Sequence, residues 1–231
     1  MRFGPLWGFV ILIGAAILVA GIGSNFHPNR GDTPPVEKQQ EEDQQKADEA
    51  KKAADATKAS MLTFDQAKEG AVKVAMEIEG KGTIAMELYP KAAPKTVAHF
   101  TDLCKKHFYD GLKFHRVVPN FVIQVGDPNS KGLDGSKMRD MTNEAVSTTF
   151  KLGGGGSGEK VPLEAKLSHK KYSVGLARSD APDSGDSQFY INLQDNLSLD
   201  GNYCVFGMVL HGQDVAAKIQ KGDVIKSLTL Q

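Results

Sequence analysis

The chain has 231 residues, which is enough for one domain with accessory segments or for two small domains. Its 28 basic and 28 acidic residues cancel, so no overall positive field favours nucleic-acid binding. The six histidines and two cysteines are scattered without metal-ligand spacing, and we expect no metal site. We interpret Cys104 and Cys204 as buried thiols, although a single disulfide between them stays open.

Residues 1–24 contain an apolar run that begins at Leu6 and ends at Ile22, with no charge inside it. A bilayer core needs about 17–25 helical residues, so the run is just long enough to span a membrane. It predicts either a retained transmembrane anchor, which we prefer, or a signal peptide cleaved before Ser24. An arginine before the run favours a cytoplasmic N-terminus. The rest of the chain would then lie on the extracytoplasmic side, either anchored or exported after cleavage.

Residues 25–62 differ in character from the segment before them. Prolines at their start break any helix. Residues 37–58 are almost entirely Glu, Gln, Lys, Asp and Ala, which favour helix but leave no large apolar side chain to bury. A coiled coil is not supported, because Leu, Ile and Val are missing from its a and d positions. We predict a solvated linker that holds the following domain away from the membrane.

The segment formed by residues 63–231 has the patterns of a folded, mainly β domain. Apolar residues alternate with polar ones over residues 72–78 and again over residues 83–88. Turn residues at 80–82 lie between the two runs. This arrangement predicts a β-hairpin with one buried face.

Two helices are predicted among the remaining strands. Apolar residues at helical spacing indicate one helix that begins at Pro94 and ends by Gly111, and a second helix fits residues 214–221. Many short strands with few helices suggest an antiparallel barrel or sandwich. The remaining predicted strands are the short apolar runs at residues 114–118, 121–125, 172–176, 188–193, 204–209 and 225–230.

Motifs for other chemistries are missing from the sequence. The glycine-rich residues 153–158 lack the Lys-Ser/Thr of a phosphate-binding loop, so we predict a flexible surface loop there. A hydrolase triad could be assembled from His115, Asp127 and Ser187, but no nucleophile-elbow motif supports it. The sequence therefore offers no nucleophile, metal or cofactor site.

Three blocks of sequence carry a family resemblance. Residues 114–124 read Phe-His-Arg-Val-Val-Pro-Asn-Phe-Val-Ile-Gln, residues 187–191 read Ser-Gln-Phe-Tyr-Ile, and residues 199–207 read Leu-Asp-Gly-Asn-Tyr-Cys-Val-Phe-Gly. Together, and in this order, they resemble the signature blocks of the cyclophilin-type peptidyl-prolyl cis/trans isomerases. The resemblance covers about residues 71–230. It implies a closed eight-stranded antiparallel barrel capped by two helices.

The resemblance also implies an activity. The expected function is to accelerate rotation about X-Pro bonds in proteins and so assist folding, without a cofactor. Its expected partners are proline-containing polypeptides, with no nucleic acid, and the domain is expected to be monomeric. The alternative is a proline-peptide binding module or holdase chaperone with little turnover. The intact Arg116, Phe121 and Gln124 favour the enzyme, because a pure binder could lose the arginine.

The resemblance assigns roles to individual residues. Arg116 is the implied catalytic residue, because a donor aimed at the prolyl nitrogen would stabilise the twisted transition state more than the planar ground state. His115 is interpreted as structural, since this chemistry needs no proton transfer. The others form an apolar slot for the proline ring, hydrogen-bonding groups for the substrate backbone, and the rest of the wall. These substrate-binding residues are Phe121, Val122, Gln124, Ala177, Arg178, Gln188, Tyr190, Leu199 and Tyr203.

Some residues depart from the expected pattern. Phe121 and Gln124 differ by an odd number, so a regular strand would point them to opposite faces unless a bulge or turn intervenes. Tyr190 replaces the more common Phe and adds a hydroxyl at the slot. Val125 replaces a glycine of the family pattern. Ser198 stands where cyclosporin-sensitive members carry Trp, which speaks against tight cyclosporin binding.

Overall fold

The computed structural model describes residues 44, 45, 48, 56 and 60–231. The predicted membrane segment and most of the predicted linker lie outside these residues. Within the described part of the chain, no helix has the length and apolar character needed to cross a membrane. Leu62 is joined to the folded domain by its backbone N–H, which donates to the carbonyl oxygen of Lys166 at 2.8 Å.

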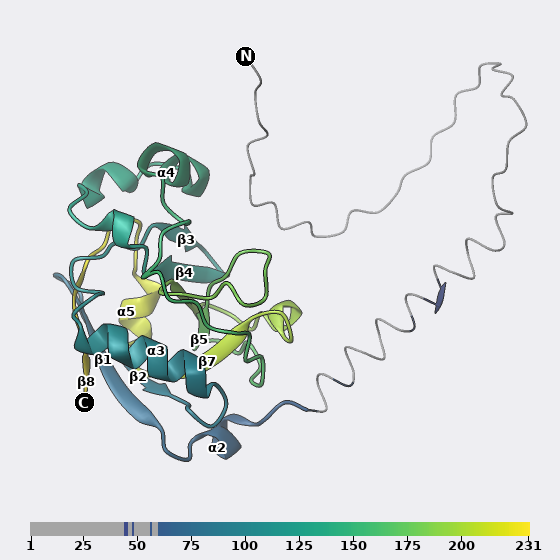
Figure 1. The fold of residues 1–231 in the computed structure, drawn as a ribbon. Coiled ribbons are helices and arrows are strands. Elements are labelled where there is room, and N and C mark those ends of the chain that lie inside the picture. The colour runs from purple at the N-terminus through teal and green to yellow at the C-terminus, as the bar shows by residue number, and fades with distance from the viewer. Residues whose placement is uncertain (1–43, 46–47, 49–55, 57–59) are drawn as a thin grey trace, which may run out of the picture. The chain divides into compact units, whose positions relative to one another are not determined.

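Eight strands form one curled antiparallel sheet, in the order β3-β4-β6-β5-β7-β2-β1-β8 (Figure 1). The predicted hairpin is present as β1 and β2, and each of the other predicted runs overlaps one strand. Alternating apolar residues drive this arrangement, because successive side chains point to opposite faces of a strand. The strands are β1 Val72–Ile78, β2 Gly82–Leu88, β3 Arg116–Val118, β4 Val122–Val125, β5 Ser173–Leu176, β6 Phe189–Asn192, β7 Cys204–His211 and β8 Ile225–Leu230.

The two strands at the ends of this order, β3 and β8, are approached by segments that pair with each other. Lys113 forms an antiparallel bridge with Val224. Phe114 donates its N–H to the Asp223 carbonyl at 3.0 Å, and its own carbonyl accepts the N–H of Gly222 at 2.9 Å. These bonds join the chain leading into β3 to the chain leading into β8.

The main core fills the inner face of the curled sheet. Its centre is an aromatic cluster in which Phe100 lies 5.0 Å from Tyr109, 5.2 Å from Phe189 and 5.0 Å from Phe206, measured between ring centroids. All four residues are at most 1% exposed. Buried rings of this size contribute much of the apolar area that stabilises a domain.

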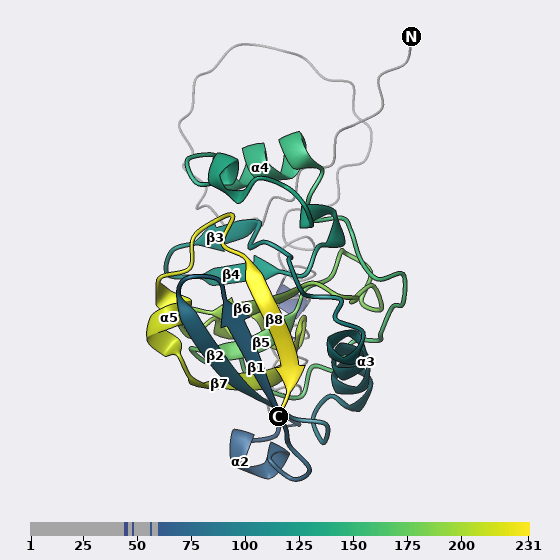
Figure 2. The ribbon, with the colours of Figure 1, turned by 90° about the vertical axis from the view of Figure 1, so that its left-hand side faces the viewer.

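Helices α3 (Pro94–Lys105) and α5 (Gln213–Ala217) lie on opposite sides of the sheet (Figure 2). Both were predicted, although each ends earlier than expected. A short helix α2 (Phe64–Ala67) and the helix α4 (Asn143–Phe150) were not predicted. Helix α4 has a small core of its own, made by Met138, Val146 and Leu152.

Both cysteines are buried free thiols, as the sequence predicts. Burial raises the pKa of Cys104 and of Cys204 to about 12, because the interior disfavours a thiolate. Neither sulfur is therefore a nucleophile at neutral pH.

Candidate active site

The register of the sheet places three of the predicted site residues side by side. Ile123 and Val125 of β4 belong to the inner core, so Gln124 between them faces outward. Arg116 of β3 and Tyr190 of β6 are the direct register partners of Gln124 on its two sides. Because antiparallel partners share a face, Arg116, Gln124 and Tyr190 form one row on the outside of the sheet.

Arg116 is held in this row by an aromatic ring and an amide. Its guanidinium carbon lies 5.6 Å from the centroid of the Phe121 ring, a cation–π distance. Its Nη1 donates to Oε1 of Gln124 at 3.4 Å. Burial lowers the pKa of Arg116 from its ordinary value, because loss of water disfavours the charged form. The guanidinium still carries its charge at neutral pH, so the row contains a partly desolvated cation.

A turn explains how Phe121 and Gln124 reach the same side. Phe121 precedes β4 and closes a turn in which its N–H donates to the Val118 carbonyl at 3.1 Å. Asn120 in this turn has a positive φ of 56°, a conformation that asparagine tolerates better than most residues. The strand alternation therefore starts only at Val122, and Phe121 is free to point toward Arg116.

A chain of amide hydrogen bonds extends the row toward the glycine-rich loop. Gln124 donates from Nε2 to Oε1 of Gln188 at 3.0 Å. Gln188 donates from its own Nε2 to the carbonyl oxygen of Gly155 at 2.8 Å. These bonds fix the orientation of both side-chain amides before a substrate binds.

The glycine-rich residues 153–158 are tied down by two carboxylates. Asp127, fully buried, accepts the backbone N–H groups of Gly153 at 2.6 Å and Gly155 at 3.1 Å. Asp186 accepts two further N–H groups of the loop, at 2.8 and 3.0 Å. A β-carbon on Gly155 would overlap the Asp127 carboxylate, so glycine permits this close approach. Residues 153–158 form a surface loop, as predicted, and four of its backbone N–H groups are bound to side chains.

Tyr190 also belongs to an apolar surface together with three other predicted substrate-binding residues, Phe121, Leu199 and Tyr203. Tyr190 is only 5% exposed, and its ring packs over Gly175, where a β-carbon would lie 2.6 Å from Tyr190 Cε2. The Tyr203 ring stands edge-on to Tyr190, with centroids 6.4 Å apart and an interplanar angle of 81°. The N–H of Tyr203 donates to the Leu199 carbonyl at 3.1 Å. Leu199, Tyr203 and Phe121 are half-buried, so their side chains remain open to a ligand.

The remaining predicted residues line the edges of this surface. The guanidinium carbon of Arg178 lies 4.7 Å from the Tyr203 ring centroid, and its Nε donates to a backbone carbonyl at 2.7 Å. The backbone N–H and C=O of Arg178 have no hydrogen-bond partner in the described part of the chain. Ala177 donates its N–H to the Gln188 carbonyl at 2.9 Å. Val122 is 2% exposed and shares the outward face with Gln124.

The candidate hydrolase triad does not assemble. His115 is 4% exposed, and neither of its ring nitrogens has a hydrogen-bond partner among residues 60–231. Burial lowers the pKa of His115 to about 4, so the ring is neutral at pH 7. Ser187 donates its hydroxyl to the Gly126 carbonyl at 2.7 Å, and Asp127 is bound to the glycine-rich loop.

Several residues that shape the site were missed. Asn143 of α4 donates to the Val117 carbonyl at 3.0 Å and accepts the Val117 N–H at 3.1 Å, and so holds the strand that carries Arg116. The buried His169 and the half-buried Asp200 form a second pair, bonded between Nδ1 and Oδ1 at 2.8 Å. Asp200 directly follows Leu199 in the third sequence block, which could have pointed to it. His169 carries no comparable local signal.

Comparisons with known proteins fit this geometry. The family model of the cyclophilin type peptidyl-prolyl cis-trans isomerases (CLD) matches residues 73–229. A peptidyl-prolyl cis-trans isomerase of Helicobacter pylori is 36% identical over 153 residues, covering 64% of this chain and 80% of the relative. Peptidyl-prolyl cis-trans isomerase B of Bacillus subtilis is 34% identical over 157 residues, covering 67% of this chain and 94% of the relative.

Solved structures share the fold. A cyclophilin type peptidyl-prolyl cis-trans isomerase of Cryptosporidium parvum superposes with a TM-score of 0.56 at 22% identity. The match covers 70% of this chain and 98% of that one. At this level of identity the likeness supports the arrangement of strands and helices.

Proposed function

The chain belongs to the cyclophilin-type peptidyl-prolyl cis-trans isomerase family, and from this premise we propose how its residues perform the reaction. It is a peptidyl-prolyl cis-trans isomerase, and its substrates are proline-containing peptides. The observation that carries the proposal is the outward row of Arg116, Gln124 and Tyr190, with the Phe121 ring against the guanidinium.

The barrier to the reaction is electronic. Amide resonance opposes rotation about the X-Pro bond by about 18–20 kcal/mol. At the twisted transition state the resonance is lost and the prolyl nitrogen gains a localised lone pair. A hydrogen-bond donor aimed at this lone pair stabilises the transition state more than the planar ground state, and so accelerates rotation. No covalent bond forms or breaks, so no nucleophile or general base is required.

Arg116 is the proposed donor. Only its Nη1 has a hydrogen-bond partner within the described chain, which leaves other guanidinium N–H groups for the substrate. Partial burial beside Phe121 strengthens such a bond, because a lower dielectric screens it less. Gln124 fixes the guanidinium before substrate arrives, so little reorganisation is needed at the moment of rotation.

The proline ring is proposed to sit in an apolar slot. Phe121, Leu199 and Tyr203 supply half-buried side chains, and Tyr190 with Val122 supplies a nearly fully buried floor. An apolar slot suits this ring, since the ring carries no hydrogen-bonding group and gains by leaving water. The slot would hold the proline side of the bond while the residue before it rotates.

The substrate backbone is proposed to bind along the polar edge. The unpaired N–H and C=O of Arg178 are suited to pair with an extended peptide, as a neighbouring strand would. The amides of Gln124 and Gln188, oriented by the glycine-rich loop, would bind the carbonyl groups of the peptide. Ala177 would set the position of this edge through its bond to the Gln188 carbonyl.

We also propose that the curled sheet closes into a barrel. The bonds between the segments leading into β3 and β8 support closure. Closure matters for the site, because β3 carries Arg116 at one end of the strand order. A strand held on both sides keeps the guanidinium in place.

The test is the rate of isomerisation of an Xaa-Pro peptide, measured by NMR exchange or a protease-coupled assay. Arg116→Ala is expected to lower kcat/KM by about 10- to 1000-fold, since each decade corresponds to roughly 1.4 kcal/mol. Arg139→Ala is the matched control. Arg139 contacts Gln220 and Asp223 outside the proposed site, so its replacement is expected to leave kcat/KM unchanged. Wild-type activity no higher than that of Arg116→Ala would favour a proline-peptide binder instead.

We further propose that the run from Leu6 to Ile22 holds this domain at a membrane, on the extracytoplasmic side. The length of the run and its lack of charge support the proposal. Membrane fractionation with a mass measurement of the mature N-terminus tests it. A mature chain that starts near Ser24 would overturn the anchor and favour export after cleavage.

A further inference from the structure

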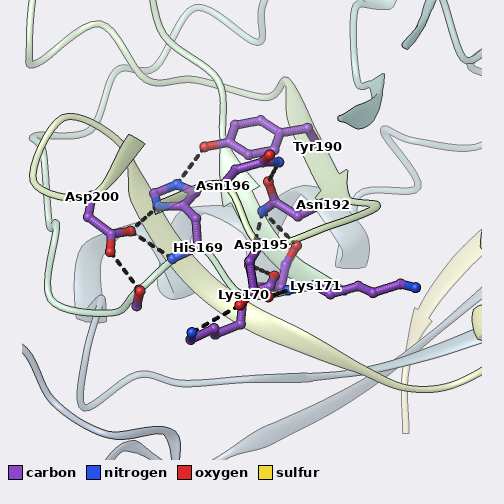
Figure 3. Close-up of polar contacts among 10 residues, drawn as sticks. His169, Lys170, Lys171, Tyr190, Asn192, Asp195, Asn196 and Asp200 are labelled. Carbon is purple, nitrogen blue, oxygen red and sulfur yellow. Dashed lines mark hydrogen bonds and ion pairs between the residues drawn. The ribbon is translucent and has the colours of Figure 1, made fainter. Parts of the chain in front are cut away.

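Asp200, His169 and Tyr190 form a hydrogen-bonded relay that ends at the tyrosine floor of the proposed slot (Figure 3). His169, which is fully buried, lies between Asp200 and Tyr190. Its Nδ1 is 2.8 Å from Oδ1 of Asp200, and its Nε2 is 2.9 Å from the Tyr190 hydroxyl. Asp200 also accepts the backbone N–H of His169 at 2.7 Å, so the carboxylate fixes both the ring and the chain that carries it.

Hydrogen-bond chemistry orders the protons in this relay. A carboxylate only accepts hydrogen bonds, so Nδ1 of His169 carries the proton that is donated to Asp200. In the neutral ring Nε2 is then an acceptor, and the Tyr190 hydroxyl must donate to it. Burial lowers the pKa of His169, which agrees with a neutral ring. The hydroxyl that distinguishes Tyr190 from Phe is therefore bound to His169.

The relay joins two walls of the slot that come from different parts of the fold. Tyr190 stands on β6, while Asp200 directly follows Leu199 at the end of the 3₁₀ turn Leu197–Leu199. The carbonyl of His169 also accepts the N–H of Asn196 at 2.8 Å. Asn196 donates in turn from Nδ2 to the Phe121 carbonyl at 3.1 Å. The segment around His169 thus contacts three of the slot's walls, directly or through one residue.

We propose that His169 is a positioning residue for the isomerase: it fixes the Tyr190 floor and the Leu199 wall at one spacing, and it binds the Tyr190 hydroxyl so that the slot stays apolar toward the proline ring. This inference rests on the proposed slot. Without His169 the tyrosine ring can shift, and its hydroxyl seeks another partner, including the substrate backbone. His169 acts through Tyr190 and, by way of Asp200, through the Leu199 wall, and it does not itself touch the substrate.

A double-mutant cycle tests this action. His169→Leu and Tyr190→Phe each remove the hydrogen bond between these two side chains, and each is expected to lower kcat/KM by roughly five- to tenfold. The loss should appear mainly as a rise in KM, because the slot holds the ring in both ground and transition states. The double variant is expected to lose no more activity than His169→Leu alone, because that single variant already leaves the Tyr190 hydroxyl without its partner. Effects that multiply would overturn the proposal, because His169 would then not act through the Tyr190 hydroxyl.

Two controls separate positioning from stability. His211→Gln changes an exposed histidine at the end of β7 and is expected to leave kcat/KM unchanged. Assays run well below the melting temperature of every variant remove the effect of unfolding. A folded His169→Leu variant with wild-type kcat/KM would overturn the proposal. If that variant does not fold, two tests are still available: the rate of Tyr190→Phe, and NMR of the His169 ring in the wild-type protein. NMR is expected to show a proton on Nδ1 alone. A neutral ring protonated at Nε2 would contradict the relay.

The failure of this inference can be told apart from failure of the slot. If Phe121→Ala and Arg116→Ala leave kcat/KM unchanged, the slot itself is misassigned. If both lower kcat/KM while His169→Leu does not, the slot stands and only the positioning role fails.

Discussion

Gly175→Ala is a small change that should disturb the proposed active site strongly. Gly175 is the register partner of Tyr190, and the tyrosine ring packs where a side chain at residue 175 would be. A β-carbon there would lie 2.5 Å from the Tyr190 hydroxyl oxygen and 2.6 Å from Cε2. The ring cannot turn aside freely, because it is 5% exposed and its hydroxyl is 2.9 Å from His169.

The size of the effect follows from these distances. Carbon atoms in contact prefer about 3.5–4.0 Å, so either the ring or strand β5 must move by about 1 Å. Overpacking of this kind costs about 1–3 kcal/mol of unfolding free energy. A misplacement of about 1 Å near a reacting bond can cost up to roughly 100-fold in rate. We therefore expect kcat/KM to fall by about 10- to 100-fold, because the floor of the slot moves.

Urea unfolding and the peptide isomerisation assay measure the two effects separately. Gly154→Ala is the matched control, since a β-carbon there meets nothing within 4 Å. It should change neither stability nor rate. Adding Tyr190→Ala to Gly175→Ala should remove the overpacking penalty, although not restore activity. If Gly175→Ala has wild-type stability and rate, the packing of the tyrosine against this strand is not what shapes the slot.

Three further predictions concern other parts of the domain. The pKa of His115 is about 4 in the folded state and about 6.5 when unfolded, so the unfolded state binds more protons between these values. Unfolding free energy should therefore fall by about 2 kcal/mol from pH 7 to pH 5 on account of this residue, and NMR titration of its ring should show the depressed midpoint. Cys104 and Cys204, whose pKa burial raises to about 12, should resist a thiol reagent in the native protein and both react in denaturant. Asn143→Ala should lower stability by about 1–3 kcal/mol, because both backbone groups of Val117 lose their partner, with a fall in kcat/KM that Arg139→Ala does not reproduce.

The strands could be predicted because their signal is local. Residues 72–78 and 83–88 alternate over several residues and flank an evident turn, and the structure has β1 and β2 there. Helix α4 was missed because its apolar face is short and packs on its own small cluster. Its N-cap, in which Thr142 accepts the N–H of Ala145 at 3.1 Å, is a local signal that could have indicated it.

The site was predictable where the three sequence blocks supply its residues. The register brings Arg116, Gln124 and Tyr190 together, and a turn resolves the parity problem of Phe121. What sequence could not show is which polar groups find each other across long separations. Asp127 accepts hydrogen bonds from glycine N–H groups 26 and 28 residues away, and the composition of the loop does not show that it is bound in this way.

The neutrality of the two buried histidines gives the site its electrostatic character. His115 directly precedes Arg116, and burial keeps its ring uncharged at neutral pH. His169 is likewise buried, and desolvation lowers its pKa despite the neighbouring Asp200. A second positive charge beside Arg116 would compete for the substrate carbonyl. It would also repel the guanidinium, because charges at a partly buried site are poorly screened. Because the reaction moves no proton, the fold gains by keeping titratable rings neutral, so that the guanidinium of Arg116 is the group that meets the developing lone pair.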